Sequence, residues 1–412
     1  MHVLGQYIDA AVLRAIVPAL FGVVVPDIVD RIIRRLGPEK RHAETDWKRP
    51  DVMRRDLGRL AEYLDGLPVS EPAVRQPFEL GLAAMRACRW AEAIGHFRDA
   101  MTVTKGTHLV ALFNLTGMCQ YTRGRPSEAL RDFEESVRLA VEYQSERGRA
   151  QALNNIGLIC HDNGELDRAL EYLGESLAMA SELDDQWAVA IQLGNTGNIW
   201  HDKGDLDKAL QHHEQALAIS RELRDQWGVA TELGNIGSIY RDKGDLDKAL
   251  QHYEQALAIS HQIGYQLGVV TGLASIGSIY RDKGRIDKVL EYEEQALAIA
   301  RKAGYSLGVA TYVGDIGLAL MEKSKHRQAV PKLAEALTIL LASGVADGPR
   351  QALTGLGRCE DRLGRKRVEG LLKGAGLDDE TIADLLERID QVRMRRPRPR
   401  GDRPPQVQTA GQ

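Results

Sequence analysis

Apolar residues recur at three- and four-residue spacing through most of the chain, and this pattern itself repeats every 40 residues. Three segments carry almost the same sequence: residues 194–222, 234–262 and 274–302. Within one unit, residues 229–263, the apolar spacing predicts two helices. Between them, Gly244 can adopt the positive φ that ends a helix, and Asp245 can cap the next one. The chain is therefore predicted to be a series of helix pairs.

Such a pair cannot bury its apolar face alone, so successive pairs must stack. We therefore expect an all-α fold, a right-handed α-solenoid of stacked antiparallel helix pairs. A glycine recurs where the first helix of each pair must approach the second, at Gly81, Gly117, Gly157, Gly197, Gly237, Gly277, Gly317 and Gly357. The expected array covers residues 73–357, with seven repeats and the start of an eighth.

The two ends of the chain depart from the repeat. Residues 1–72 are predicted to form a helical cap or association region, and residues 358–392 degenerate terminal helices. The Arg- and Pro-rich residues 393–412 are predicted to be disordered. The most apolar stretch, residues 10–25, is interrupted by Arg14 and Pro18. This favours a buried cap, or self-association through residues 1–36, over a membrane-associated segment or a small effector domain.

The pattern Leu-x-x-Ile-Gly-x-x-Tyr, followed by Gly, Ala, Tyr and Ala, resembles the tetratricopeptide repeat (TPR). The alanine of the second helix recurs at Ala93, Ala129, Ala169, Ala209, Ala249 and Ala329, with Val289 as an exception. The 40-residue period is similar to that of Pins-type scaffolds, kinesin light chains and the TPR sensor arms of bacterial signalling ATPases. This resemblance implies a non-enzymatic protein that binds a peptide or protein partner in a concave groove.

The same resemblance indicates which side chains line the groove. Two residues before the repeat glycine lie Asn155, Asn195, Asn235, Ser275 and Asp315. An asparagine amide both donates and accepts, so it can pair with a peptide main chain. Four residues after the glycine lie His161, His201, Arg241 and Arg281, each followed by Asp. These side chains either face an acidic partner or form ion pairs along the stack.

Other chemistry has weaker support. A His and the Asp that follows it point about 100° apart on a helix, which argues against a catalytic dyad. His212 and His213 are expected to point outward without a metal, and Trp187 and Trp227 to wedge between repeats. Residues 384–398 resemble a GoLoco motif, although Arg395-Arg396-Pro397 replaces its acidic core. No cofactor is expected.

Bulk properties narrow the partner and the compartment. The net charge is −4 over 412 residues, and the repeat body is mildly acidic, which argues against nucleic-acid binding. The four cysteines form no CxxC pair and suit a reducing cytoplasm: Cys88, Cys119, Cys160 and Cys359. The sequence therefore predicts a cytoplasmic interaction scaffold. The alternative is a sensor that binds a small peptide or effector and changes its superhelix or signals through its N-terminal segment.

Overall fold

The computed structural model describes residues 72–86, 89–342 and 349–394. Within these ranges all regular secondary structure is α-helical, as the sequence predicts. The helices follow one another as pairs, and a last helix closes the series. The bounds are α4 Pro72–Arg86 with α5 Trp90–Met101, α6 Thr107–Thr122 with α7 Pro126–Glu142, α8 Glu146–Asp162 with α9 Leu166–Glu182, α10 Gln186–Asp202 with α11 Leu206–Glu222, α12 Gln226–Asp242 with α13 Leu246–Gln262, α14 Gln266–Asp282 with α15 Ile286–Lys302, α16 Ser306–Glu322 with α17 His326–Ala342, α18 Pro349–Leu363 with α19 Arg365–Gly374, and α20 Asp379–Met394.

The turn inside each pair has the predicted chemistry. Gly244 has φ of 82°, a left-handed conformation that is strained for other residues. The Asp245 side chain then accepts a hydrogen bond of 3.1 Å from the Lys248 backbone N–H at the start of α13. The repeat glycine of the preceding helix lets the two helices approach. A Cβ placed on Gly237 would lie only 2.9 Å from the ring of Tyr253.

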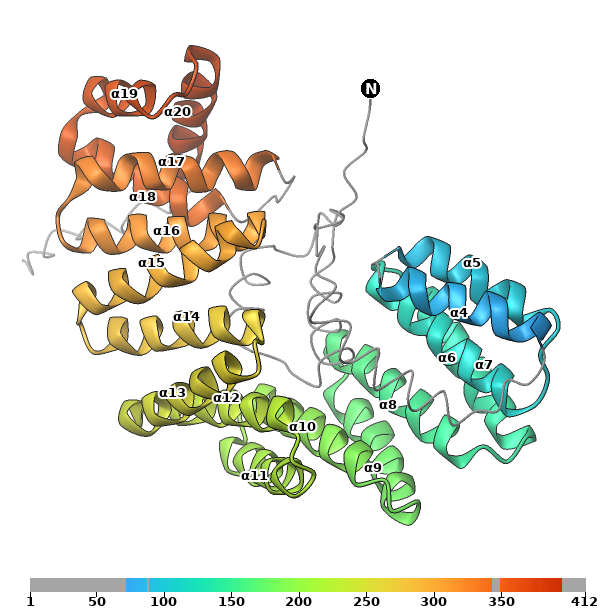
Figure 1. Cartoon of the computed structure of the whole chain (residues 1–412). Coiled ribbons are helices and arrows are strands. Elements are labelled where there is room, and N and C mark those ends of the chain that lie inside the picture. Colours follow the sequence, from blue (N-terminus) through green and yellow to red (C-terminus); the bar gives the residue numbers. More distant parts are fainter. Residues whose placement is uncertain (1–71, 87–88, 343–348, 395–412) are drawn as a thin grey trace, which may run out of the picture.

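The helix pairs stack into an open arc (Figure 1). Within a pair the two helices pack closely, and each second helix also packs on the first helix of the next pair. First helices touch across pairs, as α8 does with α10 and α10 with α12. The second helices α9 and α11 lie on the outer side of the arc. The first helices therefore form the concave surface of a TPR-like solenoid.

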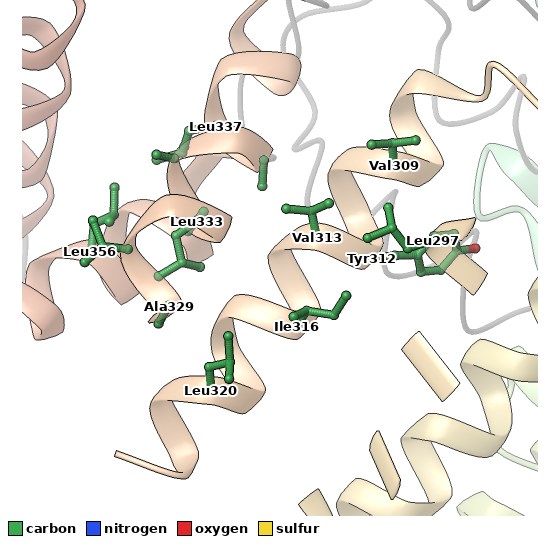
Figure 2. Close-up of a cluster of buried hydrophobic side chains, with 14 of the residues drawn as sticks. Leu297, Val309, Tyr312, Val313, Ile316, Leu320, Ala329, Leu333, Leu337 and Leu356 are labelled. Atoms are coloured by element: carbon green, nitrogen blue, oxygen red, sulfur yellow. The ribbon is translucent and has the colours of Figure 1, made fainter. Parts of the chain in front are cut away.

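The largest apolar core lies at the C-terminal end of the array. It joins α14–α17 to α18, α19 and α20. In Figure 2, Leu333 and Leu337 of α17 lie between Val313 of α16 and Leu356 of α18. Helix α20 contributes Leu385, Leu386 and Ile389 to this core, each less than 5% exposed. The apolar residues of the GoLoco-like stretch thus cap the solenoid, while residues 395–398 lie outside the described ranges.

Several expectations from the sequence fall outside the described residues. They are the association region within 1–71, including the apolar segment 10–25, the tail after 394, and Cys88. These remain predictions. In the described part of the chain, no helix is both long and apolar enough to cross a membrane.

Candidate functional site

The predicted groove residues do lie in one row along the first helices, but they are largely covered. Each is at most 9% exposed: Asn155 and Asn195 in α8 and α10, Asn235 in α12, Ser275 in α14 and Asp315 in α16. Neighbouring first helices pack so closely that they cover these side chains. A ligand can therefore contact these side chains only where neighbouring first helices are separated or move apart.

The amides in the middle of this row are incompletely hydrogen-bonded. Asn195 donates from Nδ2 to Asn154 Oδ1 of the preceding repeat, at 3.1 Å. Its Oδ1 has no partner within the described structure, and neither amide atom of Asn235 or of Asn198 has one. A buried polar group without a hydrogen bond costs about 1–3 kcal/mol. Helices α10 and α12 therefore carry several buried donors and acceptors that are not used within the described structure.

The residues four positions after the glycine bind their own neighbours. His161 Nε2 lies 2.8 Å from Asp202 Oδ2, and His201 Nε2 lies 2.9 Å from Asp242 Oδ2. Two further contacts have the same spacing of 41 residues, from Tyr121 to Asp162 and from Arg281 to Glu322. His161, His201 and Arg281 thus form contacts along the stack, and their binding of an acidic partner remains a prediction.

This row of contacts ties α6 to α8, α8 to α10, α10 to α12 and α14 to α16. Burial by itself would raise the pKa of Asp242, but the hydrogen bond from His201 and the charge of Arg241 outweigh burial and lower that pKa below its usual value. Arg241 also reaches the adjacent Asp242, at 3.1 Å. The carboxylate is therefore charged at neutral pH and holds α10 against α12.

A buried contact between the second helix α11 and the following first helix α12 could not be predicted from single helices. His213 was expected to point outward, but it is 1% exposed, and its Nδ1 lies 2.7 Å from Glu232 Oε2 in α12. Gly197 makes room for the ring: a Cβ there would lie 2.7 Å from it. His213 stands 40 residues from Tyr253, which is also buried, so aligning the repeats would have placed it in the core.

The two tryptophans of the inter-repeat turns differ in their packing. Trp187 is 37% exposed rather than wedged between repeats, whereas the ring of Trp227 packs on that of Tyr265, with 5.7 Å between the ring centres.

The described cysteines are free and buried. Burial raises the pKa of the Cys359 thiol to about 11, so at neutral pH it is an unreactive thiol. Among the described residues, no cluster of three or more His, Cys, Asp or Glu could hold a metal ion.

Stacked helix pairs, close glycine contacts and ties between first helices define an α-solenoid repeat protein. Residues 148–222 and 229–302 match the family model of the tetratricopeptide repeat. The matched residues lie within helices α8 to α15, so this part of the array is built from tetratricopeptide repeats. No curated protein matches the chain by sequence.

Solved structures share the fold at low sequence identity. A Rap protein complexed with Competence and Sporulation Factor has a TM-score of 0.55 and 14% identity, covering 84% of this chain and 93% of its own. Aspartyl phosphate phosphatase F from Bacillus subtilis has a TM-score of 0.53 and 12% identity, covering 95% and 96%. A signal transduction ATPase with a tetratricopeptide repeat sensor, from Pyrococcus horikoshii, has a TM-score of 0.51 and 14% identity, covering 89% and 54%. At these identities the likeness concerns the fold alone.

Proposed function

We propose that the chain is a non-enzymatic interaction scaffold whose concave surface binds an extended peptide or a segment of a partner protein. The observation that carries this proposal is the set of buried amides without partners on α10 and α12, Asn195, Asn198 and Asn235. An extended main chain presents N–H and C=O groups in alternation, and side-chain amides can match both. The Rap protein of similar fold, complexed with Competence and Sporulation Factor, is a precedent for a bound factor.

One observation favours a second candidate, a sensor. Asn195 and Asn235 are each 2% exposed, and the His161–Asp202 and His201–Asp242 contacts hold the first helices together. A ligand that reaches these amides must separate the helices and so change the pitch of the superhelix. Small-angle scattering with and without the captured partner distinguishes the two candidates, because a rigid scaffold keeps its dimensions and a sensor does not.

The binding proposal is tested with Asn235→Ala, alone and together with Asn195→Ala. Because neither amide atom of Asn235 has a hydrogen-bond partner among the described residues, its removal should leave the melting temperature unchanged or slightly higher. Capture of partners from native lysate on the immobilised full chain should be lost. The matched control is Asn163→Ala, an exposed asparagine in the turn after α8, which should capture as the wild type does. Full capture by the Asn235→Ala chain would remove the groove from consideration.

The free cysteines indicate the compartment. Cys119, Cys160 and Cys359 are free thiols, which suit a reducing environment. We therefore assign the scaffold to the cytoplasm. Labelling of intact cells with a thiol reagent that does not cross membranes should leave the protein unmodified even after it is unfolded for analysis.

A further inference from the structure

A cleft of about 400 Å³ lies between the end of α11, one face of α12 and the exposed side of α13. Its floor is apolar, with Val229 and Leu233 of α12 and Ile259 of α13. Its rim is polar, with Arg221 and Arg224 from the end of α11 and Gln255 from α13. The rim residues are exposed and belong to the second helices and the turn that follows α11. The cleft is thus separate from the concave row of asparagines.

The two arginines of this rim have no acidic partner among the described residues. Most other charged side chains in the middle repeats are paired, such as Lys243 with Asp207 and Lys248 with Asp245. Between the two arginines, Leu223 is 43% exposed. The rim therefore combines two arginines that form no ion pair with a described acidic residue, although Glu222 and Asp225 are their sequence neighbours, with an exposed aliphatic side chain.

Two other junctions in the array show what this cleft lacks. Eighty residues further on, Arg301 stands where Arg221 does and Glu335 stands where Gln255 does, and the two side chains form an ion pair. Eighty residues earlier, Glu175 occupies the place of Gln255 and pairs with Arg149. In both cases the chain supplies a carboxylate at this position. At the α11–α13 junction it supplies a neutral amide, and the arginines remain without an acid.

Arg224 lies in a turn whose backbone is left-handed in five successive repeats. Arg224 has φ of 55°, close to the 53° of Gln144 and 52° of Asp184 in the two equivalent turns before it, whereas Gly264 and Gly304 occupy the next two, at 68° and 65°. A residue with a Cβ is strained there and glycine is not. The arginine therefore stands in a conformation that the same turn, 40 residues later, gives to glycine, and its side chain lies at the rim of the cleft.

We propose that this cleft docks an acidic, apolar segment of a partner protein. A glutamate or aspartate carboxylate would lie between Arg221 and Arg224, where Glu335 lies in the later junction, and would form charge-assisted hydrogen bonds. A neighbouring large aliphatic side chain would cover the floor of Val229 and Leu233. The segment docks on the outer side of the solenoid, so this surface and the concave groove bind independently.

The probe is a short fluorescein-labelled peptide with leucine and glutamate at helical spacing, and its counterpart has glutamine in place of glutamate. Binding to the full chain is followed by fluorescence anisotropy. The glutamate peptide should bind about tenfold or more tightly than the glutamine peptide, because a hydrogen bond to a charged group is lost. The difference should shrink as salt rises.

Two variants taken from the chain's own repeats sharpen the test. Arg224→Gly should weaken binding of the glutamate peptide about tenfold while raising the melting temperature, because strain is relieved. Gln255→Glu should also weaken binding, because Arg221 then pairs internally as Arg301 does. Asn235→Ala in the groove should bind the peptide as the wild type does.

Three results would overturn the proposal. The first is equal affinity for the two peptides, and the second is wild-type binding by both Arg224→Gly and Gln255→Glu. The third is loss of binding in Asn235→Ala, which would place the peptide in the groove. If the wild type forms dimers that Gln255→Glu dissociates, and binds no peptide, the occupant is a second copy and the proposed partner is wrong.

Discussion

The middle of the array and its C-terminal end use one backbone period to build two kinds of interior. In α14–α20 a single apolar core spans several helices and includes Leu333 and Leu356. In α10–α13 the apolar clusters are small, and they share the interior with His213, Glu232 and Asn235, none more than 4% exposed. The difference shows that the repeat specifies where the helices lie. Individual positions within it decide whether the interior is apolar and stabilising or contains polar groups without hydrogen bonds.

The largest effect is expected where the polar interior is disrupted. His213→Ala leaves Glu232 buried without its partner, and should lower the free energy of unfolding by about 3–5 kcal/mol. The matched control replaces the pair by the residues found 40 positions later, His213→Tyr with Glu232→Gly. That double variant should unfold within about 1.5 kcal/mol of the wild type, because apolar replacement of a buried pair is close to neutral. Urea unfolding followed by circular dichroism measures both.

A small loss in His213→Ala would contradict this account of the middle repeats. It would mean that water solvates Glu232, so that the interior of α10–α13 is not closed to solvent. The double variant can also contradict the prediction. If it is as destabilised as His213→Ala, Tyr253 and Gly272 fit only their own repeat, and the two repeats are not interchangeable.

The second effect is expected in the apolar end. Leu333 is fully buried and touches the space over Gly317, so Leu333→Ala should cost about 2–5 kcal/mol through lost burial and a cavity. Because α18–α20 share this core, the loss should spread to them. Amide hydrogen exchange should quicken in α17–α20 and stay unchanged in α6–α9. Exchange that quickens uniformly along the chain would instead show that the array unfolds as one unit.

The sequence predicted the fold well because its signals are local. Helix spacing, the positive φ at Gly244 and the cap at Asp245 each depend on a few neighbouring residues, and repetition confirms them several times. The place of Asn235 within α12 could also be predicted, because it depends only on its distance from Gly237. Its burial could not, since burial depends on how closely successive first helices pack.

The misplaced residues have a common physical reason. His213 is polar, and on a single helix a polar residue beside His212 indicates an outward face. Its true environment depends on Glu232, which lies in the next repeat, and on the space over Gly197. Contacts at a separation of 41 residues, such as His161 with Asp202, likewise become visible only when the stacking of pairs is known.

The smallest effect is expected from a row of surface ties that runs through both regions. Lys243 contacts Asp207 in the middle, and Lys323 contacts Asp287 near the C-terminal end. The two aspartates are 87% and 85% exposed, and exposed pairs contribute about 0–1 kcal/mol. Lys243→Ala and Lys323→Ala should therefore each change the free energy of unfolding by less than about 1 kcal/mol, and by the same amount in urea titrations. If Lys243→Ala costs clearly more, the middle repeats depend on surface ties to compensate for their polar interior. The difference between the two regions would then lie in how neighbouring pairs are held together, and not only in what they bury.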